Sequence, residues 1–185
     1  YLGEKPFQRG VRNYLKQHSE SNAEGRDLWK ALAKSSGVEV EKIVKAWINQ
    51  PGFPVVSLAP EEKDGKAGLR VQQDRFLGSP TTKVAKNSPS TWPIPLLVKT
   101  PGRGKKSISR ALVKRKSEWV PLAGGSPVSG FYGNASGGGF YRPLHGSEEL
   151  AALTKDGGQR LDAVERMGLV GHQWALVRAG RAELS

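Results

Sequence analysis

The chain has 185 residues, and its 29 lysines and arginines against 17 aspartates and glutamates give it a net charge of +12. It contains no cysteine, which excludes a disulfide framework and a thiolate metal site. No stretch approaches the roughly 18 apolar residues of a membrane span, and a cytoplasmic location is expected. The charge suggests an acidic partner. The chain begins at Tyr1 rather than Met, which suggests that it is processed or excised from a longer protein.

Residues 1–52 are predicted to form three helices, because apolar residues recur there at helical spacing. Asn22 is placed to cap the second helix, and Gly37 is placed to end it in a left-handed conformation. Pro51 ends the third helix, since proline disfavours helical backbone at the residue before it. The three apolar stripes include Phe7, Val11, Leu15, Leu28, Leu32, Val40, Ile43, Val44 and Trp47.

Residues 53–143 are predicted to form a central antiparallel immunoglobulin-like β-sandwich, because short strand patterns alternate with turn signals and no helical pattern lies between them. Leu69, Val71 and Gln73 share one parity, as in a half-buried strand. Trp92–Lys99 contains two prolines, which fit an edge strand. Glycine, proline and serine dominate residues 121–139, which indicates a loop.

Residues 144–185 return to a helical pattern, so the fold class is α+β with helices at both ends. Ser147 can cap a first helix. Leu161, Val164 and Met167 form a stripe that Gly168 is expected to end, and a second stripe is expected to end at Gly180. Four tryptophans lie in apolar stretches and are predicted to anchor cores; they are Trp47, Trp92, Trp119 and Trp174.

The sequence offers no catalytic or metal-binding constellation. His18, His145 and His172 lie on three separate segments, and no H-E-x-x-H motif is present, so surface or capping roles are the simpler interpretation. No G-x-S-x-G motif supports a serine nucleophile. Pro101–Ser107 fails as a phosphate loop, because Lys106 stands where that motif needs Ser or Thr. We therefore predict no catalytic, cofactor-binding or metal-binding residue on this chain, and no bound cofactor.

A cluster of basic residues can be interpreted in two ways. It can be a polyanion-binding face, with Trp92 or Trp119 available to stack on bases. On that interpretation the chain would be a basic β-sandwich module that binds nucleic acid or an acidic protein. It can also be a solvated sheet edge whose lysines block edge-to-edge pairing. We favour the second interpretation and do not expect nucleic-acid binding, because aromatic residues are not interleaved. The cluster comprises Lys99, Arg103, Lys105, Lys106, Arg110, Lys114, Arg115 and Lys116.

Several segments resemble the aminopeptidase N family of zinc metallopeptidases. The most specific is Trp47–Val56, a Trp-x-x-Gln-Pro-Gly-aromatic-Pro-Val-Val string that is similar to the end of that family's catalytic domain. Gln73–Phe76 and Trp92–Leu96 resemble its β-sandwich domain, and Gly139–Arg142 resembles the exit from that domain. Arg166–Gly180 resembles the opening of its helical C-terminal domain.

The resemblance implies three parts: 1–52 as the helical end of a thermolysin-like catalytic domain, 53–143 as the β-sandwich domain, and 144–185 as the start of the helical C-terminal domain. In this family an H-E-x-x-H helix and a later Glu hold zinc, and a Gly-x-Met-Glu-Asn strand binds the substrate amine. Neither motif occurs here, so zinc and peptide substrates are implied for a full-length parent.

The chain itself would then be an inactive scaffold between the catalytic and helical domains. Its partners would be the rest of its own polypeptide. The family's oxyanion-stabilising tyrosine is not assigned to Tyr1, Tyr14 or Tyr141. A third possibility is an interaction domain retained without an enzyme.

Overall fold

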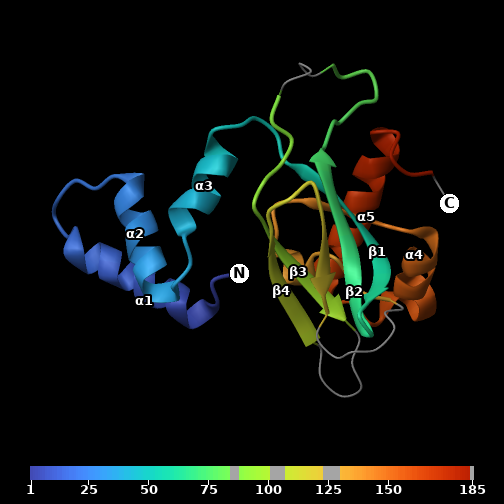
Figure 1. Ribbon diagram of the computed structural model, residues 1–185, viewed down its shortest axis with the longest axis horizontal. Helices are drawn as coiled ribbons and strands as arrows, with labels where there is room; N and C mark the ends of the chain where they lie inside the picture. The colour runs from blue at the N-terminus through green and yellow to red at the C-terminus, as the bar shows by residue number, and fades with distance from the viewer. Residues whose placement is uncertain (84–87, 101–106, 123–129, 184–185) are drawn as a thin grey trace. The chain divides into compact units, whose positions relative to one another are not determined.

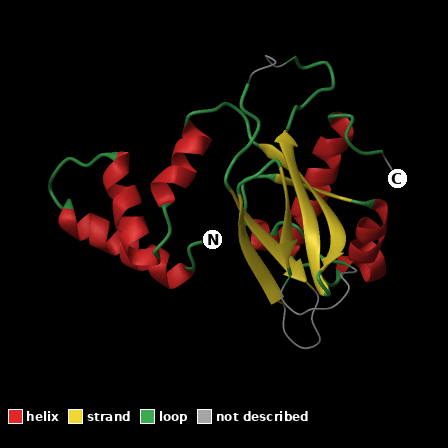
Figure 2. Ribbon diagram, viewed as in Figure 1, coloured by secondary structure: helices red, strands yellow, loops and turns green. Residues whose placement is uncertain are grey.

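The computed structural model describes residues 1–83, 88–100, 107–122 and 130–183. The chain divides into two compact units, Tyr1–Pro51 and Gly52–Ser185. The described residues form five α-helices, a four-stranded sheet and a two-stranded sheet, so the fold class is α+β (Figures 1 and 2). None of the described helices is long and apolar enough to cross a membrane.

The first unit is built from the three predicted helices, α1 (Glu4–Gln17), α2 (Gly25–Ser36) and α3 (Val40–Ile48). Helices α1 and α2 approach closely at Gly10, where a Cβ atom would lie 2.6 Å from Ser35 Oγ. A glycine at this position therefore lets the two helices pack together.

The sequence predicted the C-terminal end of α2 correctly, but not the residue that caps its N-terminal end. Asn22 is not the cap; Glu24 is, and it forms a reciprocal capping box with Asp27. The capping box satisfies two amide groups that a single Asn side chain would not. Gly37 ends α2 with φ 71°, as predicted, and α3 ends at Ile48, before Pro51.

The second unit contains all the strands. Strands β1 (Pro54–Lys63), β2 (Lys66–Arg75), β5 (Ser117–Pro121) and β6 (Arg142–His145) form one sheet in the order β5-β2-β1-β6. Strands β3 (Ile94–Thr100) and β4 (Ser107–Val113) form the two-stranded sheet (Figure 2). The expectation of a wholly antiparallel arrangement is wrong, because β6 runs parallel to β1 with Val55 opposite Arg142. A parallel partner needs a long connection, and here that connection carries β2 to β5.

The predicted alternation in β2 is confirmed. Leu69 and Val71 are completely buried and Gln73 is 1% exposed. Trp119 of β5 covers Gly68 so closely that a Cβ atom there would lie 2.5 Å from the indole ring. Its Nε1–H also donates to the carbonyl oxygen of Glu61 at 3.1 Å.

The C-terminal helices are α4 (Ser147–Thr154) and α5 (Ala163–Arg178), with short 3₁₀ segments η1 (Ala135–Gly137) and η2 (Lys155–Gly158). The cap of α4 is Gly146 rather than Ser147. Gly168 does not end a helix, because α5 continues through it. A Cβ atom at Gly168 would lie 2.8 Å from the Tyr132 hydroxyl, so this glycine provides space. The predicted stop at Gly180 is confirmed by φ 67° just beyond α5.

Helix α5 presents an unexpected face to the sheet. Its buried residues are Glu165, Leu169 and Leu176. The predicted stripe residues Val164 and Met167 are exposed instead. Trp174 is 59% exposed, so it is no core anchor, whereas Trp92 is fully buried as predicted.

Candidate functional site

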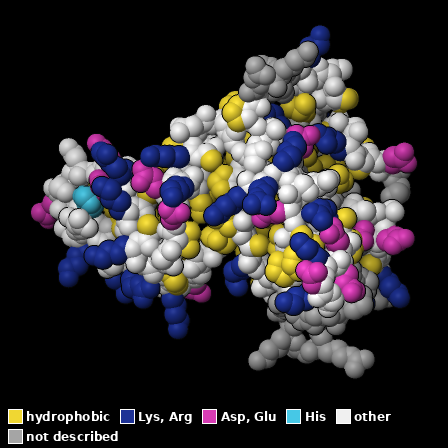
Figure 3. Space-filling view, in the orientation of Figure 1, with side chains coloured by type: hydrophobic (Ala, Val, Ile, Leu, Met, Phe, Trp, Pro, Cys, Tyr) yellow, Lys and Arg dark blue, Asp and Glu magenta, His cyan; other side chains and the backbone are white. Residues whose placement is uncertain are grey.

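The predicted basic cluster does not form a single face among the described residues. Lys99 is 6% exposed and forms an ion pair with Glu165 of α5. Lys116 donates to Asp74 at 2.9 Å and to Ser90 at 3.3 Å, while Arg110, Lys114 and Arg115 are exposed. Figure 3 shows basic side chains mixed with acidic ones on the visible face. The remaining members of the cluster, Arg103, Lys105 and Lys106, lie outside the described residues.

Glu165 is the centre of a buried polar group between β3 and α5. Its carboxylate accepts hydrogen bonds from the backbone N–H of Asp162 at 3.0 Å and of Ser136 at 3.1 Å, in addition to the Lys99 ammonium group. Burial, together with the charges of Glu165 and Asp162, raises the pKa of Tyr132 to about 12. Three chain segments therefore converge on one carboxylate.

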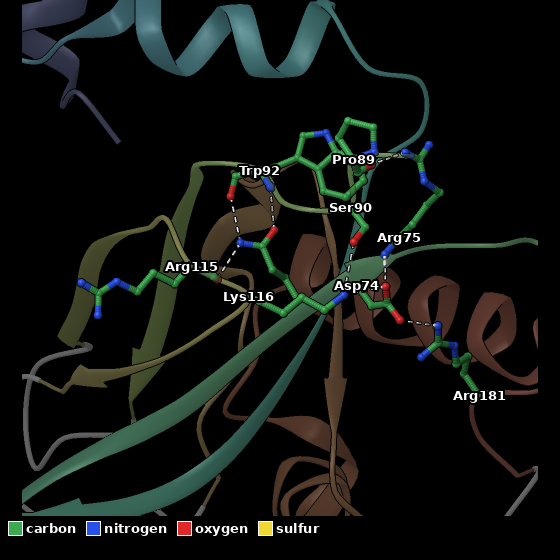
Figure 4. Close-up of polar contacts among 9 residues, drawn as sticks. Asp74, Arg75, Pro89, Ser90, Trp92, Arg115, Lys116 and Arg181 are labelled. Atoms are coloured by element: carbon green, nitrogen blue, oxygen red, sulfur yellow. Dashed lines mark hydrogen bonds and ion pairs between the residues drawn. The ribbon is translucent and has the colours of Figure 1, made fainter. Parts of the chain in front are cut away.

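A second polar group lies at the end of β2, at Gln73, Asp74 and Arg75, and we call it the β2 joint (Figure 4). The Gln73 side chain donates to the carbonyl oxygens of Trp92 and Arg115, both at 2.9 Å, and accepts from the Trp92 N–H at 2.8 Å. This buried amide ties β2 to the segment entering β3 and to the turn between β4 and β5. Its hydrogen-bonding groups are satisfied by backbone, as buried polar groups require.

Asp74 extends the β2 joint to the end of the chain. Its carboxylate accepts from Lys116 at 2.9 Å, from the Arg75 N–H at 2.9 Å and from Arg181 at 3.3 Å. Burial opposes ionisation of this carboxyl, but these donors outweigh it and lower the pKa of Asp74. The Arg75 guanidinium donates to the carbonyl oxygen of Pro89 and lies 5.4 Å from the centre of the Trp92 ring.

Each of the three histidines has structural surroundings. His18 is the C-terminal cap of α1, and its ring lies beside that of Tyr14. His145 of β6 accepts a hydrogen bond at Nε2 from the Gly133 N–H at 3.0 Å, and burial, with the nearby His172, lowers its pKa to about 4. Burial and the Arg142 charge lower the pKa of His172 of α5 to about 4 as well.

These residues do not fit a zinc site. Within the ranges that the structure describes, no group of three or more His, Cys, Asp or Glu side chains could hold a metal ion. A catalytic zinc needs three protein ligands. His145 also uses its Nε2 lone pair for Gly133, so it serves the fold as a hydrogen-bond acceptor.

Arg142 connects β6 to the middle of α5. Its guanidinium lies 5.6 Å from the ring centre of Phe53 and 4.8 Å from that of Phe76. It also approaches the carbonyl oxygen of Gly171 at 3.5 Å and Nδ1 of His172 at 3.4 Å. Polar contacts thus attach α5 to the strands at its start through Glu165, at its middle through Arg142, and beyond its end through Arg181.

A shallow pocket of about 340 Å³ lies over β1, β2 and β6. Two basic groups line it, and both are engaged: Arg70 is held by Glu61 through contacts of 2.6 and 2.5 Å, and His145 is bound to Gly133. The pocket therefore supplies no free acid–base group from these two residues.

Sequence reasoning assigned no role to Glu165 or Asp74. The sequence did contain an indication for Glu165, because Asp162 and Glu165 have the spacing of a capping box. For Gln73 the signal was its position on the buried parity of β2, since a buried amide must find partners. Asp74 carries no such signal, because its partners are distant in the sequence.

Known proteins resemble this chain along its whole length. Residues 1–47 match the family model described as the Peptidase family M1 domain. The chain is 33% identical over 186 residues to a puromycin-sensitive aminopeptidase of Caenorhabditis elegans, covering 100% of this chain and 19% of that protein. It is 32% identical over 184 residues to the Tricorn protease-interacting factor F2 of Thermoplasma acidophilum, covering 100% of this chain and 21% of that protein.

A leucyl aminopeptidase of Saccharolobus solfataricus is 28% identical over 181 residues, which are 98% of this chain and 21% of that protein. The chain therefore spans about a fifth of the length of the curated relatives it matches.

Proposed function

Because the chain belongs to the M1 family of peptidases, that of aminopeptidase N, we propose that it is a non-catalytic scaffold segment of a zinc aminopeptidase. The parent would remove N-terminal residues from peptides. One observation carries this proposal: nearly the whole chain aligns with two relatives named as aminopeptidases, yet its sequence contains neither the H-E-x-x-H motif nor the Gly-x-Met-Glu-Asn motif.

The zinc of the parent would be held outside this chain, where it would polarise the scissile carbonyl and activate a water molecule. The partners of the chain are then the rest of its own polypeptide, and peptides are substrates of the parent. We assign residues 1–52 to the end of the catalytic domain, 53–143 to an immunoglobulin-like sandwich, and 144–185 to the start of the helical domain.

The contacts of the second unit support a scaffold role. Strands and C-terminal helices belong to one compact unit, Gly52–Ser185. Helix α5 is attached to it by Lys99–Glu165 at its start and by Asp74–Arg181 beyond its end. A compact unit of this kind can hold two flanking domains in a fixed relation.

The first test is hydrolysis of leucine p-nitroanilide by the purified chain, with and without added zinc. We expect no turnover under either condition. Zinc-dependent turnover that a chelator removes would overturn the proposal.

A second measurement addresses the basic-module alternative, by a gel mobility shift with duplex and single-stranded DNA. The scaffold proposal predicts no shift even at low salt, where phosphate contacts are strongest. A shift that weakens steeply with salt would favour the alternative. The coding sequence upstream provides an independent check, since an H-E-x-x-H motif with a later Glu is expected there.

A further inference from the structure

Helix α5 has two faces that could meet the sheet. One carries Leu169 and Leu176, which are 7% and 0% exposed. The other carries a stripe with more apolar residues, at spacings of three and four. The stripe consists of Val164, Met167, Val170 and Trp174, which are 61%, 78%, 71% and 59% exposed. At about 100° per residue the two faces lie on opposite sides of the helix.

Apolar burial alone does not explain the observed orientation. Burial of apolar area is the main favourable term in packing, and it favours turning the outward stripe toward the strands. Exposed stripes of this size are uncommon on soluble proteins. A different interaction must therefore select the face that α5 presents to the sheet.

The buried polar group at the start of α5 is that interaction. Glu165 lies on the same face as Leu169 and Leu176, and it is 1% exposed. Its carboxylate binds the Lys99 ammonium group of β3 and the Ser136 N–H, while it also caps its own helix at Asp162. If α5 were turned over, Glu165 would move to solvent and Lys99 of β3 would be left buried without its ion-pair partner, and an unpaired buried charge is strongly unfavourable.

We propose that the Lys99–Glu165 ion pair is an orientation lock, which selects the face of α5 that packs on the sheet and keeps the stripe from Val164 to Trp174 outward. Buried ion pairs often contribute little net stability, and their best-attested role is to select one arrangement among several. The inference deepens the proposed scaffold function and rests on it, because it determines which surface of the scaffold faces outward.

The chain has a single methionine, Met167, which lies in the outward stripe. A ¹³C-labelled methionine methyl group therefore gives one NMR signal from this position, and Met167→Leu confirms its assignment. A soluble paramagnetic agent broadens this signal in proportion to the exposure of the methyl group. The measurement thus reports directly whether the stripe faces water.

The lock is removed by the double substitution K99L/E165S, which removes both charges without adding apolar area to the face of α5 that carries Leu169 and Leu176. A second variant, K99L/E165Q, keeps a side-chain acceptor at the start of α5 for the backbone N–H groups. The matched control is R70L/E61Q, which removes the ion pair between β1 and β2 without touching α5. All variants are compared with the unchanged chain.

We expect the paramagnetic broadening at Met167 to fall at least twofold in K99L/E165S or K99L/E165Q, because α5 turns its apolar stripe inward, and to stay unchanged in the control. The proposal is overturned if Met167 is as exposed in both lock variants as in the unchanged chain. That result would mean either that α5 keeps its orientation without the ion pair or that the variants do not fold. Peptidase activity plays no part in this measurement. A failure of the orientation-lock proposal is therefore distinguishable from a failure of the scaffold proposal.

Discussion

The buried imidazole of His145 makes a specific prediction about acid stability. His145 is 4% exposed, and its Nε2 atom must stay unprotonated to accept the Gly133 N–H at 3.0 Å. Burial lowers its pKa from 6.5 to about 4, so between these values the unfolded chain binds a proton that the folded chain does not. The stabilisation from neutral His145 is therefore complete above pH 6.5 and is lost as pH falls toward 4.

The size of this destabilisation follows from the shift in the pKa of His145. Each pKa unit corresponds to about 1.4 kcal/mol, so the free energy of unfolding falls by about 2 kcal/mol at pH 5 and about 3 kcal/mol at pH 4 from this residue. His145→Gln offers a non-titrating acceptor to Gly133 and should remove this part of the pH dependence. The other titratable groups are present in both proteins, so the difference between the two reports His145 together with its interaction with the nearby His172.

The assay is urea unfolding at pH 7 and pH 5, followed by circular dichroism. With a slope of roughly 1–3 kcal/mol per molar urea, the midpoint of the unchanged chain should fall about 0.7–2 M further than that of His145→Gln. Equal shifts in the two proteins would refute the reasoning, because they would show that protonation of His145 does not oppose folding.

Two further predictions concern the core of the second unit. The Tyr141 hydroxyl accepts from the Leu97 N–H at 3.1 Å and donates to the Gly133 carbonyl oxygen at 2.7 Å, so Tyr141→Phe should cost about 1–3 kcal/mol in urea unfolding. The control is Tyr14→Phe, which keeps the ring contact with His18 and should cost nothing measurable. A Cβ atom at Gly133 would lie 2.2 Å from Leu58 Cδ1, so Gly133→Ala should lower the melting temperature and cost about 1–3 kcal/mol of unfolding free energy. The control is Gly78→Ala, because a Cβ atom at Gly78 meets nothing within 4 Å. Equal melting temperatures for the two variants would contradict the steric argument.

Local signals explain what the sequence predicted correctly. The stop at Gly37 depends on glycine tolerating a positive φ, the end of α3 depends on Pro51, and the burial of Gln73 depends on strand alternation. Each of these features is determined by residues within a few positions. They could therefore be recognised without knowing the rest of the fold.

Features that depend on distant residues could not be recognised in this way. The orientation of α5 depends on Lys99, which is remote in sequence from Glu165, so the apolar stripe at Val164 and Met167 gave the wrong face. The parallel pairing of β6 depends on a strand that begins at Pro54. The role of Asp74 depends on Arg181, which no local pattern connects to β2.

The parallel pairing of β6 with β1 has a consequence for how the second unit is made. Strand β1 is synthesised before β2 to β5, and the partner on its outer edge, Arg142–His145, emerges only after them. Until then β1 carries an unpaired edge, and such edges invite association with other chains. Long-range pairing of this kind also slows folding. A nascent or truncated chain that stops before Arg142 is thus the form most exposed to aggregation.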